Sequence, residues 1–253
     1  MDMNIEKYSK EALEKKALDG DADAMWQLSL LCQDEGDEDE SANWFGKALD
    51  AGQTDALLYA AELCLNKELE VYSVDHAEMY LKQAADQGSI KAMLQLGKLA
   101  LGDLEEGFMQ AAIRLAQTEN ADKTPSPEHQ KQFAWYSLAA EAGDINAMYN
   151  VAVAYHLGYP VEEDQAQAFA RLKRAVDSGD LVSMYLLAYL YENGLGTERD
   201  IDKAVEIYTE SGEKGVRGSL LRLYGIYHEG LGHIEPDQEK ALRYLWMSGE
   251  GHT

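Results

Sequence analysis

The chain has 253 residues, of which 46% are hydrophobic and 27% are charged, the ordinary balance of a globular protein large enough to bury a core. Its formal net charge of −24 argues against nucleic acid and anionic membranes as partners, because both are themselves negatively charged. The expected partner is a protein with a basic surface; the alternative is that the acidic coat only keeps the chain soluble.

Helix-favouring residues dominate the chain, which has only 4 prolines. Its first residues, MDMNIEKY, show neither the basic nor the apolar segment of a secretion signal, and no window has the length of a membrane span. We therefore expect an all-α, cytoplasmic protein. Cys32 and Cys64 lie next to leucines and are expected to be buried thiols, with a disulfide between them as the alternative.

Glycines recur at a fixed interval along the chain, which indicates a repeat protein. Gly143, Gly179 and Gly215 are 36 residues apart, and so are Gly52 and Gly88. A small residue follows each glycine by four positions, and mostly apolar residues follow by five, eight and eleven or twelve, which is one face of an α-helix. A second amphipathic segment precedes the next glycine, so the predicted unit is a helical hairpin.

The predicted helices have recognisable ends. Asp164, Asp200 and Asp237 precede the second helices, where a carboxylate can accept hydrogen bonds from free amide groups. The recurring glycine is expected to end that helix in the left-handed conformation. The Gly-Leu-Gly segments at 194–196 and 230–232 follow no β-strand and lack the lysine of a phosphate cradle. They are therefore predicted to be hairpin loops with positive φ, and not a nucleotide site.

The interval is broken once, between Gly88 and Gly143, by 19 additional residues, which we place at about 103–124. An extra helix is predicted there, followed by a loop. That helix either packs on the convex side of the protein as a structural patch or projects as a contact with a partner. Its apolar stripe is expected to consist of Phe108, Ala112, Leu115 and Ala116.

The repeated unit resembles that of the Sel-one-like repeat family, whose members are related to tetratricopeptide repeats but have a longer hairpin loop. The segment 183–215 matches the family's Leu, Tyr, Gly-x-Gly, Asp, Lys-Ala and closing Gly positions, and FAWYSLAAEAG at 133–143 supplies Trp-Tyr and Ala-Ala-Glu-x-Gly. The resemblance covers about six units, although the first unit lacks four loop residues. It implies an α/α right-handed superhelical solenoid of about six hairpins with an extra N-terminal helix, forming a single domain over 1–253.

The resemblance also implies a non-catalytic bacterial scaffold or adaptor that binds a protein or peptide on its concave face. Aromatic side chains with a few polar neighbours suit such a groove, because aromatics bury much area at low entropic cost. The alternative is that these side chains are packed between adjacent helices. The candidate residues at the positions where the first helix of each repeat is expected to line the concave face are Trp26, Tyr149, Tyr185, Tyr189, His156, Glu192 and His228.

A second candidate site is a run of six carboxylates within seven residues, formed by Asp34, Glu35, Asp37, Glu38, Asp39 and Glu40. It is either a solvated loop or a docking site for a partner rich in arginine and lysine. The histidines show no metal-binding spacing, and no nucleophile lies beside a base and an orienting acid, so we expect no metal, no cofactor and no catalysis.

The leading hypothesis is therefore a cytoplasmic adaptor that binds one protein, without nucleic acid or membrane. One alternative is an immunity or inhibitor protein whose acidic surface blocks a basic toxin such as a nuclease. Another is a sensor of small molecules or a weak hydrolase. The sequence does not indicate the oligomeric state.

Overall fold

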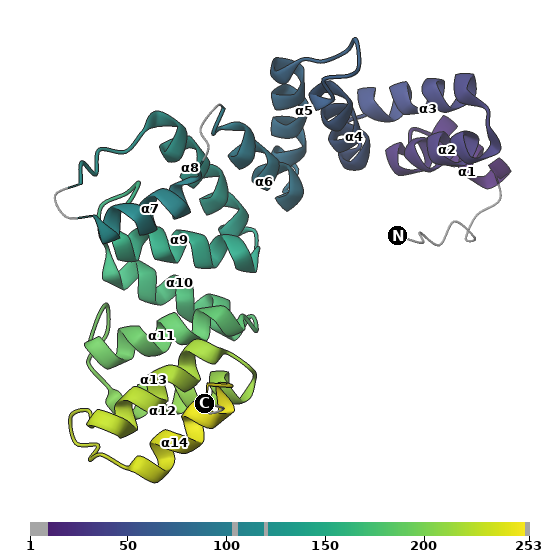
Figure 1. The fold of residues 1–253 in the computed structure, drawn as a ribbon. Coiled ribbons are helices and arrows are strands. Elements are labelled where there is room, and N and C mark those ends of the chain that lie inside the picture. Colours follow the sequence, from purple (N-terminus) through teal and green to yellow (C-terminus); the bar gives the residue numbers. More distant parts are fainter. Residues whose placement is uncertain (1–9, 103–105, 119–120, 251–253) are drawn as a thin grey trace. The chain divides into compact units, whose positions relative to one another are not determined.

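The computed structural model describes residues 10–102, 106–118 and 121–250, and these are largely helical (Figure 1). They contain fourteen α-helices and no strand, apart from one isolated bridge between Leu231 and Ile234. The all-α prediction is confirmed. No helix in these ranges is both long and apolar enough to cross a bilayer.

The chain forms two compact units, Met1–Leu99 and Ala100–Thr253. The third repeat is divided between them, because its first helix lies in the first unit and its second helix in the second unit. The predicted single right-handed solenoid over 1–253 stays a prediction. The first unit contains α1 (Lys10–Leu18), α2 (Ala22–Glu35), α3 (Glu38–Asp50), α4 (Thr54–Leu65), α5 (Val74–Asp86) and α6 (Ile90–Leu99).

In the first unit, α2 and α3 form one hairpin and α4 and α5 form the next, while α1 packs against α2. Helix α1 is the predicted extra N-terminal helix. Cys32 and Cys64 are free, buried thiols, as expected. The core around α1 to α3 consists of Leu13, Ala17, Ala24, Leu28, Cys32 and Trp44.

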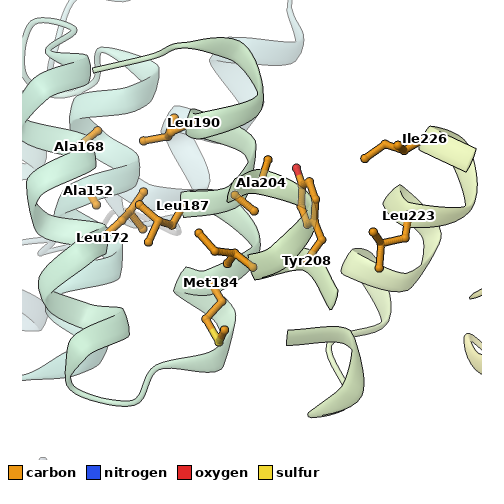
Figure 2. Close-up of a cluster of buried hydrophobic side chains, with 12 residues drawn as sticks. Ala152, Ala168, Leu172, Met184, Leu187, Leu190, Ala204, Tyr208, Leu223 and Ile226 are labelled. Carbon is orange, nitrogen blue, oxygen red and sulfur yellow. The ribbon is translucent and has the colours of Figure 1, made fainter. Parts of the chain in front are cut away.

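In the second unit, buried residues from 152 to 226 form one continuous core across successive hairpins, which Figure 2 shows, and a separate cluster surrounds the helix at 108–117. Leu172, Leu187 and Tyr208 come from successive helices, so each repeat buries its apolar face against the next, as the solenoid prediction requires. The unit contains α7 (Phe108–Gln117), α8 (Pro127–Glu141), α9 (Ile145–Leu157), α10 (Gln165–Asp177), α11 (Leu181–Asn193), α12 (Ile201–Glu213), α13 (Arg217–Glu229) and α14 (Gln238–Met247).

The predicted helix ends are also confirmed. Asp164, Asp200 and Asp237 each accept a hydrogen bond from the backbone N–H three residues later, at 2.9, 2.8 and 3.0 Å. The small residues four positions after each glycine are at most 2% exposed, which lets neighbouring helices approach closely. These residues are Ala24, Ala56, Ala92, Ala147, Ser183 and Ser219.

The insertion forms the predicted extra helix, α7, which packs against α8 and α9. Its buried residues are Phe108, Ala111, Ala112 and Leu115, while Ala116 is exposed, so the predicted stripe was wrong at one position. At about 100° per residue, Ala116 lies about 90° around the helix from the centre of the buried face. The Phe108 ring meets those of Phe133 and Tyr136 edge-on at 5.7 and 5.6 Å, so the apolar face is packed and does not project.

Candidate protein-binding surfaces

Aromatic side chains on α9 and α11 form the first candidate surface. We call Tyr149, His156, Tyr185 and Tyr189 the tyrosine face. The ring of His156 meets that of Tyr189 edge-on, with 5.9 Å between centroids, so one contact joins two repeats. Tyr185 is 37% exposed, although its ring lies 5.7 Å from the buried Tyr208 ring. The tyrosine face is therefore packed from below and accessible at its edges.

Tyr149 is half-buried on α9. Burial raises the pKa of its phenol, and the nearby carboxylate of Asp180 raises it further. The phenol therefore stays neutral at physiological pH and keeps its hydrogen-bond donor. Tyr149 and Tyr189 are both half-buried and pack against the continuous core of the second unit, as the packing alternative expects, while their contact with a partner stays a prediction.

His156 and His228, the two histidines among the predicted binding residues, each join the two helices of their own hairpin. His156 Nδ1 lies 2.8 Å from Gln165 Oε1, and Gln165 Nε2 donates to the His156 carbonyl at 3.1 Å. His228 and Gln238 repeat the arrangement at 3.0 and 3.2 Å. An amide oxygen only accepts, so Nδ1 is the donor in both pairs. These glutamines were not predicted from the sequence, although each directly follows a capping aspartate.

Glu192 occupies the position equivalent to the two histidines, but it is only 4% exposed. Arg222 on α13 donates to both of its carboxylate oxygens, one of them through Nε at 2.9 Å, and Tyr208 on α12 donates at 3.2 Å. The expectation that Glu192 faces a groove was wrong, because these two side chains close over it. Burial and the carboxylate raise the pKa of Tyr208, and the ion pair raises that of Arg222.

A second aromatic cluster lies in the first unit. Trp26 on α2, Phe45 on α3 and Tyr59 on α4 have ring centroids between 5.5 and 6.2 Å apart. They line a groove of about 320 Å³, which we call the aromatic groove. Trp26 was predicted. Phe45 and Tyr59 were missed, because Phe45 lies on the second helix of its hairpin and Tyr59 is one position beyond the one considered.

The acidic run forms the turn between α2 and α3 and the adjoining helix ends. Asp37 caps α3 by accepting from the Glu40 N–H at 3.1 Å. Lys10 Nζ lies 2.7 Å from Glu35 and 3.7 Å from Glu40, so these two carboxylates are paired. Within the described ranges, no cation pairs with the remaining members of the run, Asp34, Glu38 and Asp39.

The described residues contain no group of three or more histidine, cysteine, aspartate or glutamate side chains arranged to hold a metal ion. The candidate site residues described above are mostly aromatic rings and carboxylates. Such groups are suited to contacts with another macromolecule's surface.

Stacked helical hairpins that share a continuous core define an α-helical repeat protein. The family model for the Sel1 repeat matches residues 22–53, 70–89, 130–144, 145–180, 181–216 and 221–245, which is more than half of the chain. The chain therefore belongs to the Sel1 repeat family, and the resemblance drawn from the sequence is confirmed.

Solved structures of the same fold are similar to the chain at low sequence identity. A Sel1 repeat protein from Oxalobacter formigenes is 22% identical, with a TM-score of 0.55 over 92% of this chain and 89% of that chain. A protective antigen present in uropathogenic Escherichia coli strains, displaying an SLR fold, is 23% identical, with a TM-score of 0.52 over 96% of this chain and 56% of that chain. These likenesses show the fold alone. No curated protein matches.

Proposed function

We propose that the protein is a non-catalytic adaptor of the bacterial cytoplasm that binds one protein partner on the tyrosine face of its second unit. The observation that carries the proposal is the exposure of Tyr185, 37%, in a row of aromatic residues that otherwise border the core. Proteins built from Sel1 repeats generally serve as protein-interaction scaffolds, which supports the same class of function.

Hydrogen bonds join the helices that carry the tyrosine face to their neighbours, which favours binding. The His156–Gln165 pair ties α9 to α10, and the Glu192–Arg222 pair ties α11 to α13. Side chains held in this way lose little conformational freedom when a partner covers them, so more of the contact free energy remains as affinity. The net charge of −24 favours a partner with a basic surface.

The test compares capture of a partner by the wild-type chain and by the Tyr185→Ala/Tyr189→Ala variant. Truncating two aromatic contact residues costs about 1–2 kcal/mol each, so the affinity for the captured protein should fall by more than tenfold. Leu138→Ala is the matched control, since Leu138 is 50% exposed on α8, outside the tyrosine face. Unchanged affinity together with a large loss of stability would show that the tyrosines serve only in packing.

The second candidate function is inhibition of a basic toxin, and the net charge of −24 favours it. An acidic surface can occlude a nuclease by occupying the site of its anionic substrate. The gene of such an inhibitor is expected beside that of its toxin, and the purified protein should suppress the toxin's activity stoichiometrically. A captured partner that has no toxic activity would exclude this function.

A further inference from the structure

The aromatic groove and the acidic run are one continuous surface of the first unit. The groove is lined by residues of α2, α3 and α4, and Gly36 and Glu38 lie at its edge. The same two residues belong to the depression formed by 35–39 within the acidic run. An occupant of the groove is therefore in reach of the carboxylates.

The floor of the groove is preformed. Phe45 meets Tyr59 edge-on, with an interplanar angle of 85°, and Trp26 is tilted against both rings. The Ser41 hydroxyl donates to the Ser29 carbonyl at 2.8 Å and so holds α3 against α2 beside these rings. The volume of about 320 Å³ is at the lower end of the range of ligand pockets, about 300–1,000 Å³. It suits a large apolar side chain better than a whole cofactor.

The charge at the groove edge defines the rest of the occupant. Lys10 pairs with Glu35 and Glu40, but no cation among the described residues pairs with Asp34, Glu38 or Asp39. Glu38 lines the groove and Asp39 the adjoining depression, so they leave a negative field at one end of the apolar floor, where a cationic group is attracted and an anionic one repelled. Aromatic faces add to this preference, because cations bind favourably over their rings.

We propose that the aromatic groove binds an exposed segment of a partner protein in which a large apolar side chain is flanked by lysine or arginine. The apolar side chain packs in the groove against the rings of Trp26, Phe45 and Tyr59, and the cations face the acidic run. The inference rests on the proposed function, since both require a protein partner. It adds a second surface, in the first unit, and the chemistry that this surface recognises.

The test measures binding of defined peptides to the full chain by fluorescence anisotropy. The probe is fluorescein-labelled Lys-Arg-Phe-Leu-Arg-Lys. One control peptide, Glu-Glu-Phe-Leu-Glu-Glu, has carboxylates in place of the cations. The other, Lys-Arg-Gly-Ser-Arg-Lys, lacks the apolar anchor. The probe should bind at least tenfold more tightly than either control, and its affinity should fall steeply with salt. If the probe does not bind, or if all three peptides bind alike, the proposal is wrong.

Two variants locate the binding site. Tyr59→Ala removes an exposed ring from the groove and should weaken binding of the probe about tenfold. Tyr72 is a similarly exposed tyrosine of the same unit outside the groove, and Tyr72→Ala should leave binding unchanged. Glu38→Gln/Asp39→Asn should weaken binding of the probe about three- to tenfold at low salt and much less at high salt. The matched charge control is Glu68→Gln/Asp86→Asn, two exposed carboxylates outside the run. Equal weakening by variant and control would overturn the proposal.

Other occupants give different results. Self-association of the wild-type chain that Tyr59→Ala abolishes would assign the groove to a second copy. Binding of the probe only after deletion of residues 1–9 would assign it to the chain's own N-terminal segment. Either outcome overturns the proposal. Failure of the proposed function is distinguishable, because Tyr185→Ala/Tyr189→Ala affects capture of the partner through the second unit and leaves probe binding unchanged.

Discussion

Replacing loop glycines by alanine separates two reasons for which a repeat needs glycine. Gly179, Gly196 and Gly232 all have positive φ, of +93°, +70° and +61°. A Cβ at Gly179 would meet nothing within 4 Å. A Cβ at Gly196 would overlap the carbonyl oxygen of Gln165, in the first turn of α10, whereas at Gly232 it would overlap the Ile201 Cδ1, the end of a flexible side chain.

These surroundings predict a ranked loss of unfolding free energy. Holding alanine at positive φ costs about 1–2 kcal/mol, and the stiffer unfolded chain returns about 0.4–1 kcal/mol, so Gly179→Ala should cost about 1 kcal/mol. Gly232→Ala adds a rotamer change of about 0.5–1.5 kcal/mol, giving about 2 kcal/mol. Gly196→Ala must displace backbone, which adds about 1–3 kcal/mol and gives about 2–4 kcal/mol.

Urea unfolding followed by circular dichroism measures the three losses, and hydrogen exchange locates them. Amide exchange in the first turn of α10 should accelerate in Gly196→Ala and stay unchanged in Gly179→Ala, because only the former displaces Gln165. If all three variants lose the same free energy, backbone conformation alone sets the cost. The close approach of the loop to the preceding repeat would then contribute nothing.

Two further predictions concern charged pairs. Arg222→Ala should cost about 3–5 kcal/mol because it strands the buried carboxylate of Glu192, and Glu192→Leu/Arg222→Leu should recover part of that loss in urea unfolding. Arg171 and Arg174 lower the pKa of Glu141 below its ordinary value of 4.5. The pairing therefore stabilises the fold fully above pH 4.5, and this stabilisation is lost as the pH falls through the lowered pKa. Carboxyl carbon NMR should show a midpoint below 4.5 that rises in Arg171→Ala/Arg174→Ala; an unchanged midpoint would mean that neither arginine contributes.

Most of the fold could be predicted from the sequence because it depends on local rules that recur. Each recurring residue type has one structural role, and the structure shows that role. Small residues four positions after a glycine are buried between helices, aspartates cap helix N-termini, and glycines with positive φ follow helix C-termini. The split of the third repeat between two units was not predicted. The inserted helix α7 lies between α6 and α8 in the chain and packs against α8 and α9, and periodicity does not predict where an inserted helix packs.

The candidate site could be predicted only in part. A repeat position indicates which helix face a residue occupies, and this was sufficient to expect Tyr185 to be exposed and Trp26 to lie at a surface groove. It was not sufficient for Glu192, whose burial depends on Arg222, thirty residues later and in a different repeat. Nor does periodicity predict that Phe45 and Tyr59 meet across two hairpins. Such pairs involve residues that differ from repeat to repeat, so the pattern cannot predict them.

The departure of the first repeat from the family pattern explains why its surface differs from that of the others. Only two residues separate α2 from α3, whereas seven separate α9 from α10. The short turn places the carboxylates of both helix ends beside the aromatic groove. In two of the longer hairpins, a loop glycine instead lies close to the preceding repeat, Gly196 at Gln165 and Gly232 at Ile201. Restoring a Gly-x-Gly loop between Glu35 and Asp37 should therefore move the acidic run away from the groove and remove the salt dependence of peptide binding, while its apolar contribution persists.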